Sequence, residues 1–126
     1  MHVRQTVRKR QTGHFEDGGP AAAADPKATA IVGADRDTTA LDVAQAFFSS
    51  PTMLAFAVDA AFPDALSGGP WLGQAGPLLL TPPCGTVPAD ITAYVSSVNS
   101  TVGAAALFGG ANAVGDDVLT QLDAAL

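Results

Sequence analysis

The side chains with which enzymes usually move protons are almost absent from most of this chain. Between residues 28 and 126 the sequence contains no histidine, no lysine and no glutamate. General acid–base catalysis would have only aspartates, Tyr94 and Cys84 to use, and none of them is the usual proton carrier near neutral pH. Cys84 would also need a neighbouring base to act as a nucleophile. We therefore assign no catalytic residue and expect a protein that is not an enzyme.

Three aspartates offer the remaining enzymatic chemistry, which is metal binding. Asp35 and Asp37 follow one expected strand and Asp64 follows the next, and their carboxylates could together hold Mg²⁺ or Ca²⁺. The alternative is structural: the first two cap a turn and pair with Arg36, while Asp64 lies in a first helical turn. We favour the structural interpretation and expect no metal and no cofactor. A small metal-dependent phosphotransfer or hydrolytic domain stays as an alternative.

Two further features could bind an anion. Arg36 is the only basic residue between positions 28 and 126, and a guanidinium can hold a phosphate or carboxylate through two parallel hydrogen bonds. Pairing of Arg36 with Asp64 or a neighbouring aspartate is the alternative. The pair Gly109-Gly110 follows an expected strand and could let main-chain amides approach an anion at the next helix terminus. It could equally mark a tight turn.

Composition limits the partners. The 126 residues carry a formal net charge of −6, and the part from residue 28 onward has one arginine against nine aspartates. Because phosphate contacts need clustered Lys and Arg, we expect no nucleic acid as a partner. No apolar stretch approaches the roughly 20 residues that span a bilayer, so we expect no membrane insertion. The single cysteine permits no disulfide within the chain, and no export signal is visible in the polar N-terminal segment.

The hydrophobic pattern predicts an α/β fold, in detail a three-layer α/β/α arrangement with a mainly parallel four-stranded sheet. An amphipathic helix follows each of four short apolar runs, which are the expected strands. These runs cover residues 29–32, 53–58, 78–80 and 104–108. Because ligands of such sheets usually bind at the carboxyl ends of the strands, the loops after these runs are the expected binding region.

Turn-forming residues set the expected boundaries. Asp37 or Thr38 is expected to cap the first helix, and the second is expected to begin at Pro63. Gly68-Gly69-Pro70 is expected to bend or interrupt that second helix. Residues 1–27 show no periodicity and are interpreted as a flexible tail or linker, which leaves residues 28–126 as a single module.

Four short motifs follow one another along residues 29–126. They are Gly33-Ala34-Asp35-Arg36-Asp37-Thr38-Thr39-Ala40, Phe62-Pro63-Asp64-Ala65-Leu66, Pro77-Leu78-Leu79-Leu80-Thr81, and Gly109-Gly110 followed by Ala113-Val114. Together they resemble one module of the cell wall binding repeat 2 family. The resemblance covers the whole predicted module.

The resemblance implies a secreted surface-protein module that anchors proteins to the Gram-positive cell wall without a covalent bond. The implied partner is an anionic polymer attached to peptidoglycan, and the implied location is the cell wall or the extracellular space. Packing with sister modules or as a homotrimer is also implied. The ligand-binding residues expected on this basis are Arg36, Thr39, Asp64, Gly109 and Gly110. A structural self-assembly unit without affinity for walls is a further alternative.

Overall fold

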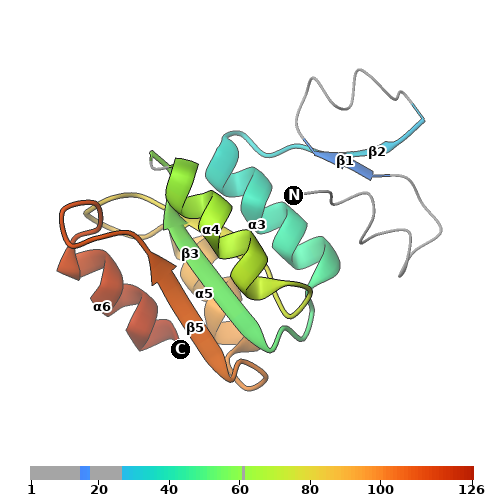
Figure 1. The fold of residues 1–126 in the computed structure, drawn as a ribbon. Coiled ribbons are helices and arrows are strands. Elements are labelled where there is room, and N and C mark those ends of the chain that lie inside the picture. Colours follow the sequence, from blue (N-terminus) through green and yellow to red (C-terminus); the bar gives the residue numbers. More distant parts are fainter. Residues whose placement is uncertain (1–14, 18–26, 61) are drawn as a thin grey trace.

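The structure has an α/β fold built on a parallel sheet (Figure 1). The computed structural model describes residues 15–17, 27–60 and 62–126, and only the main chain of residues 15–17 and 62–64. In chain order the elements are β1 (Phe15–Asp17), β2 (Thr29–Ile31), α3 (Arg36–Phe47), β3 (Met53–Val58), α4 (Phe62–Leu72), β4 (Leu78–Thr81), α5 (Ala89–Val98), β5 (Ala104–Phe108) and α6 (Asp116–Ala125). The predicted α/β class is confirmed. None of the described helices is long and apolar enough to cross a membrane.

The main sheet has three parallel strands in the order β4-β3-β5. The first expected strand is not part of it, so the predicted four-stranded sheet is not found in the described chain. That segment forms β2, which pairs with β1 in a separate two-stranded parallel sheet. Because β2 has only three residues, it can make few ladder hydrogen bonds, and it makes them with β1. Residues 1–14 and 18–26 of the expected tail lie outside the described residues.

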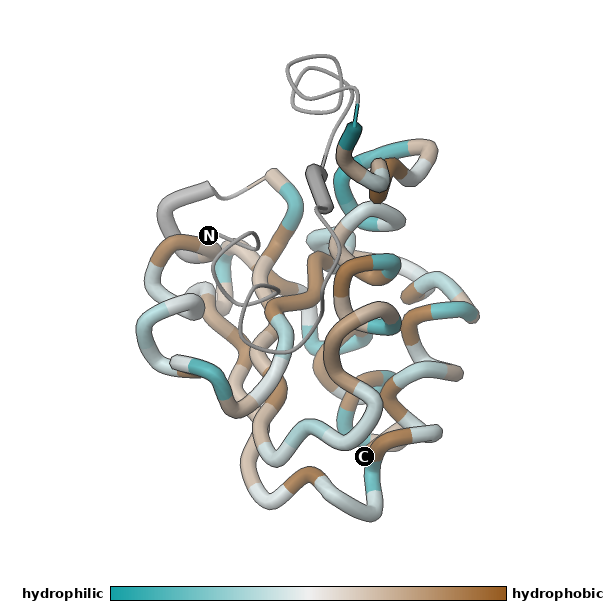
Figure 2. Tube along the Cα trace, turned by 90° about the vertical axis from the view of Figure 1, so that its right-hand side faces the viewer, coloured by the Kyte–Doolittle hydropathy of each residue, from teal (hydrophilic) through white to brown (hydrophobic). Residues whose placement is uncertain are grey.

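The central strand β3 is buried from Leu54 to Val58. Its side chains alternate between the two faces of the sheet. Leu54, Phe56 and Val58 belong to the main hydrophobic core, together with buried residues of α3, α5 and α6. Figure 1 shows α4 on the opposite face of β3 from α5, and Figure 2 shows hydrophobic stretches, in brown, along the strands and parts of the helices.

The face of β3 that meets α4 carries small residues, Ala55 and Ala57. This lets the helix approach closely. A Cβ atom added at Gly68 would lie only 2.9 Å from Leu78 Cδ1 and 3.4 Å from Phe108 Cδ2. Glycine at position 68 therefore sets the distance between α4 and the sheet.

Two of the predicted helix boundaries are wrong. The N-cap of α3 is Asp35, whose carboxylate accepts a hydrogen bond from the Thr38 main-chain N–H at 2.8 Å. Helix α4 runs from Phe62 to Leu72 and contains Pro70 in its last turn. Burial of Gly68 and Leu72 against the sheet holds the helix together through the proline, so packing outweighs the local preference for a break.

At Gly76 two main-chain segments cross in close contact. The segment that leads into β4 crosses the start of β3, where the Thr52 and Met53 N–H groups both donate to Ala75 O, at 2.9 and 3.3 Å. A Cβ atom on Gly76 would lie 1.6 Å from Met53 O. The opposing group is main chain, so the contact cannot be relieved by a side-chain rotation.

We expect Gly76→Ala to lower the free energy of unfolding by about 3 kcal/mol or more, because the β3–β4 crossing must open. Gly69→Ala is the matched control: it lies in α4 with nothing within 4 Å of the added Cβ, and it should stabilise the protein by up to about 1 kcal/mol. Urea unfolding followed by circular dichroism measures both. Equal stability of the two variants would contradict the crossing described above.

Candidate functional site

Three elements meet at the carboxyl end of the sheet. The exposed Arg36, the first residue of α3, donates from Nη1 to Asp59 O at 2.8 Å. Asp59 follows β3, and its N–H donates to Thr81 O, at the end of β4, at 3.0 Å. These two hydrogen bonds connect the start of α3 to the ends of two neighbouring strands. Arg36 therefore lies at the carboxyl end of β3.

The turn before α3 is held by its own side chains. The Thr39 hydroxyl accepts from the Gly33 N–H and donates to Asp35 O, both at 2.9 Å. Asp35 accepts from both the main-chain N–H and the hydroxyl of Thr38. A Cβ atom on Gly33 would lie 2.5 Å from Thr39 N, so the turn requires glycine there. The motif spacing from Gly33 to Thr39 thus has a direct structural reason, and it occupies the Thr39 hydroxyl.

The two aspartates that flank Arg36 have pKa values shifted in opposite directions. Hydrogen bonds from Thr38, helped by the Arg36 charge, lower the pKa of Asp35. Burial, followed by the negative charges of Asp59 and Asp35, raises the pKa of Asp37, against the effect of Arg36. Asp37 Oδ1 is buried and has no hydrogen-bond partner among the described residues. The ionised form of Asp37 is therefore disfavoured in the folded protein.

Thr81 is the other buried polar group in this region. Its residue has no exposed surface, and its Oγ1 has no hydrogen-bond partner within the described chain. The Thr81 carbonyl, by contrast, is the acceptor for Asp59. The main chain of Thr81 thus serves the link between the strand ends, and its hydroxyl does not.

Metal binding gains no support from the described residues. Within residues 15–17, 27–60 and 62–126 no group of three or more His, Cys, Asp or Glu side chains is placed to hold a metal ion. Asp64 lies in the first turn of α4, but its side chain lies outside the described residues. Asp35 is engaged as a helix cap.

The glycine pair lies at the end of β5. Gly109 has φ +145°, a conformation that favours glycine. The Gly110 carbonyl accepts from the N–H groups of Ala113 and Val114, at 2.8 and 3.1 Å, and an added Cβ there would meet open space. Because the strands are parallel, this turn lies on the same edge of the sheet as Arg36. Among the described residues, Arg36 and Thr39 make their side-chain hydrogen bonds with Asp59, Gly33 and Asp35, and not with this turn.

Sequence reasoning missed a clamp between α6 and the β4–α5 loop. Asp117 accepts from the Gly85 N–H at 2.6 Å. The Gln121 amide donates to Gly85 O at 2.8 Å and accepts from the Val87 N–H at 2.9 Å. Two acidic residues, Asp116 and Asp117, also occupy the first turn of α6, which makes that helix terminus a poor place for an anion. No local pattern signals these contacts, because they join residues more than thirty positions apart.

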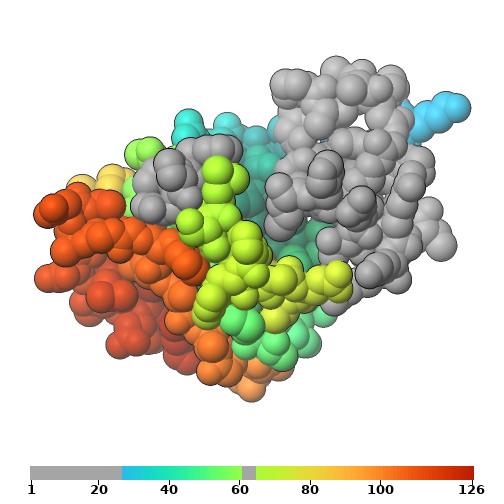
Figure 3. Space-filling model, in the orientation of Figure 1, coloured from blue at the N-terminus to red at the C-terminus, as the bar shows by residue number. Residues whose placement is uncertain are grey.

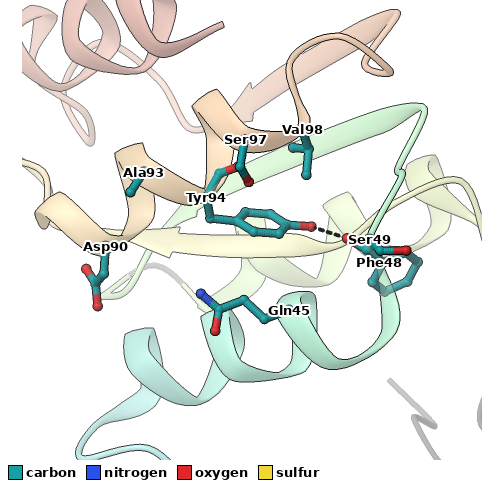
Figure 4. A pocket seen from close by; sticks show the side chains of 8 residues that line it. All are labelled: Gln45, Phe48, Ser49, Asp90, Ala93, Tyr94, Ser97 and Val98. Atoms are coloured by element: carbon teal, nitrogen blue, oxygen red, sulfur yellow. Dashed lines mark hydrogen bonds between the residues drawn. The ribbon is translucent and has the colours of Figure 1, made fainter.

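Sequence reasoning also missed a pocket between α3 and α5 (Figure 4). It is open and has a volume of about 440 Å³. Its lining residues are Gln45, Phe48, Ser49, Asp90, Ala93, Tyr94, Ser97 and Val98. The Tyr94 hydroxyl donates to Phe48 O at 2.8 Å, which joins the two helices, and burial raises the pKa of Tyr94 to about 12. None of the five expected ligand-binding residues lines this pocket.

Comparison with protein families identifies the chain. Residues 30–119 match the model of the family described as cell wall binding domain 2, CWB2. The chain belongs to the CWB2 family. The match runs from β2 into α6 and thus includes the whole three-stranded sheet. Comparison with curated proteins and with solved structures gives no match.

Membership of the CWB2 family indicates the general function of this domain. CWB2 is a family of binding domains and not of enzymes, which agrees with the expectation of a non-enzyme. It indicates binding to the cell wall and a location at the wall or outside the cell. Within this CWB2 domain, the spacing from Gly33 to Thr39 builds the turn that precedes Arg36 and α3.

Tyr94 is expected to make the folded state less stable at alkaline pH. Because its pKa is raised from 10.0 to about 12, the folded state holds the phenolic proton more tightly than the unfolded state does. The resulting stabilisation is complete below pH 10 and is lost as the pH rises through 12. We expect Tyr94→Phe to flatten this loss and to cost about 1 kcal/mol at neutral pH through the missing hydrogen bond to Phe48 O. Urea unfolding from pH 8 to pH 12 measures both effects, with Ser97→Ala in the same pocket as the control that should keep the alkaline loss.

Asp37 is expected to make the folded state less stable as the pH rises from acidic to neutral, whereas an aspartate in an ion pair would make it more stable. Because its pKa is raised, it favours the folded state at low pH, and that contribution is lost as the pH rises through its folded pKa. We expect Asp37→Asn to reduce this loss, so that the variant gains stability relative to the wild type between acidic and neutral pH. Thermal unfolding across that range is the measurement, and exposed Asp123→Asn in α6 controls for net charge. Identical pH profiles for the two variants would contradict the buried position of Asp37.

Proposed function

We propose that this CWB2 domain is a non-covalent anchoring module that binds anionic polymers attached to peptidoglycan. The observation that carries the proposal is the position of Arg36. It is the only basic residue from position 28 onward, it is exposed, and a strand-end carbonyl orients it through one hydrogen bond. A guanidinium has five N–H groups, so donors remain for a phosphate or carboxylate.

The five proposed ligand-binding residues have three kinds of role. Arg36 would contact the polymer. Thr39 supports it from the turn, because its hydroxyl is engaged with Gly33 and Asp35. Asp64 and the pair Gly109-Gly110 border the same edge of the sheet and would limit the shape of the bound segment. Residues 28–126 are proposed as the binding module, with residues 1–27 as a tail or linker and the cell wall of Gram-positive bacteria as the location.

The acidic surface constrains how such a polymer binds. With nine aspartates against one arginine, the module repels polyanions at long range, and salt screens this repulsion. Binding would therefore depend on Arg36 locally, or on divalent cations that bridge a carboxylate and the polymer. The two cases differ in their response to a chelator.

We expect Arg36→Gln to lose most of the retention on bacterial sacculi, because no other basic side chain of the module can replace it. Co-sedimentation with intact sacculi and with sacculi stripped of anionic polymers measures this, with and without a chelator of Ca²⁺ and Mg²⁺. Lys27→Gln removes the same charge outside the motif and should pellet like the wild type. Arg36→Lys keeps the charge without the bidentate geometry and should bind at an intermediate level.

The outcomes separate the explanations. Equal pelleting of Arg36→Gln and the wild type would remove Arg36 from the site, and equal pelleting with stripped sacculi would exclude the anionic polymer. Loss of binding with the chelator would assign the contact to bridging cations. Urea unfolding of each variant measures its stability. It thereby shows whether a variant that no longer pellets has lost only the polymer contact or has also been destabilised by loss of the Arg36–Asp59 hydrogen bond.

A further inference from the structure

The pocket between α3 and α5 lies on the side of the sheet opposite α4, whereas Figure 3 presents the α4 side of the molecule. Its apolar part consists of Phe48, Tyr94 and Val98, whose exposed fractions are 8%, 6% and 4%. The buried hydrogen bond from the Tyr94 hydroxyl to Phe48 O fixes the distance between the two helices. The pocket is therefore formed before a ligand binds, and its volume of about 440 Å³ is in the range of small-molecule sites.

The polar side chains of this pocket come from both helices. Figure 4 shows the Gln45 side chain extending from α3, and the Asp90 side chain extending from the start of α5, into the space between the helices. Ser97 lies in the last turn of α5, and Ser49 follows the end of α3. All four residues are exposed. Their polar groups are therefore accessible to water, which a ligand with matching hydrogen bonds can replace.

Most of these groups can only accept hydrogen bonds from a ligand. The Ser97 hydroxyl already donates its proton to Tyr94 O at 2.6 Å, and the Tyr94 hydroxyl donates to Phe48 O at 2.8 Å. Asp90 accepts from the next main-chain N–H through Oδ1 at 3.0 Å, which leaves its second carboxylate oxygen for a ligand. The Gln45 amide can both donate and accept. The pocket therefore suits a ligand that carries several hydrogen-bond donors.

Charge decides between an anionic and a cationic ligand. Of the eight described residues that line the pocket, none is basic and Asp90 is acidic. The last turns of α3 and α5 also contain no basic residue, so the negative ends of both helix dipoles lie near Ser49 and Val98 without a basic side chain of either helix to compensate them. A phosphate or carboxylate is therefore disfavoured in this pocket, and an ammonium group is favoured.

We propose that the pocket between α3 and α5 binds an amino sugar with a free ammonium group. Asp90 holds the ammonium, and the Gln45 amide and the Ser97 oxygen bind hydroxyl groups of the ring. The C–H face of the ring packs on Tyr94 and Val98. An amine without a ring leaves the Gln45 amide and the apolar surface unused, and a neutral sugar leaves Asp90 without an opposite charge. The inference does not depend on polymer binding at Arg36, because none of the five proposed ligand-binding residues lines this pocket.

NMR titration of the isotope-labelled full chain tests the pocket with three probes at constant ionic strength, below neutral pH. Glucosamine carries the ring and the ammonium, glucose carries the ring without the charge, and ethylamine carries the charge without the ring. We expect glucosamine to shift the main-chain amide signals of Gln45 and Ser97 and the side-chain amide signals of Gln45. Its dissociation constant should be about threefold to fivefold lower than that of glucose, the ratio that one exposed ion pair gives. Ethylamine should bind more weakly than glucosamine.

Two pairs of variants separate the contributions of charge and shape. Asp90→Asn should make the affinities for glucosamine and glucose equal, whereas Asp123→Asn, at an exposed position of α6, should keep the preference. Ala93→Trp fills the rim of the pocket from an exposed position of α5 and should abolish binding of both sugars. Its matched control is Ala124→Trp, at an exposed position of α6. The NMR spectrum of each variant also shows whether it is folded.

The outcomes decide the proposal independently of the sacculus experiment, because Arg36→Gln should bind glucosamine as the wild type does. The proposal is overturned if glucosamine does not bind, or if the shifted signals lie outside α3, α5 and the residues next to them. It is also overturned if glucose or ethylamine binds as tightly as glucosamine, if Asp90→Asn keeps the preference, or if Ala93→Trp binds like the wild type.

Discussion

Burial of β3 is the constraint on which the rest of the structure depends. A parallel strand with no charged or polar side chain must be covered on both faces, and each face demands a different solution. Large residues such as Phe56 interlock with α3, α5 and α6 on one face. On the other face small alanines and Gly68 let a single helix, α4, approach closely. The glycine at 76 follows from the same constraint, because the chain must cross the start of β3 without a side chain.

This packing also decides where polar chemistry can occur. With both faces of the sheet covered, the main-chain groups at the carboxyl ends of the strands are left for loops to satisfy. The chain meets this need with the Arg36 side chain on Asp59 O and with Asp117 and Gln121 on the β4–α5 loop. Arg36 is therefore both a structural hydrogen-bond donor and the exposed cation of an acidic module. Carboxylates surround this cation. One of them, Asp37, is partly buried and holds its proton more tightly than usual, because burial and the neighbouring negative charges raise its pKa.

Membership of the CWB2 family indicates that the domain binds the cell wall. The Gly33–Thr39 turn is held in one conformation, because its side chains satisfy its own main-chain groups.

The sequence by itself determined the fold class, the family and most of the elements. Apolar runs as continuous as Met53–Val58 and motif glycines such as Gly33 carry their meaning locally, because burial and close approach restrict the residue type at each position. Arg36 was recognisable for the same reason: a single cation in an acidic module is visible without coordinates. The tertiary structure alone decided that β2 lies outside the main sheet, that α4 continues through Pro70, and that Thr39 is engaged within its turn. It also revealed the Asp117–Gln121 clamp and the pocket at Tyr94. Such features depend on contacts between distant segments, and those contacts arise only when packing of the whole chain competes with local preference.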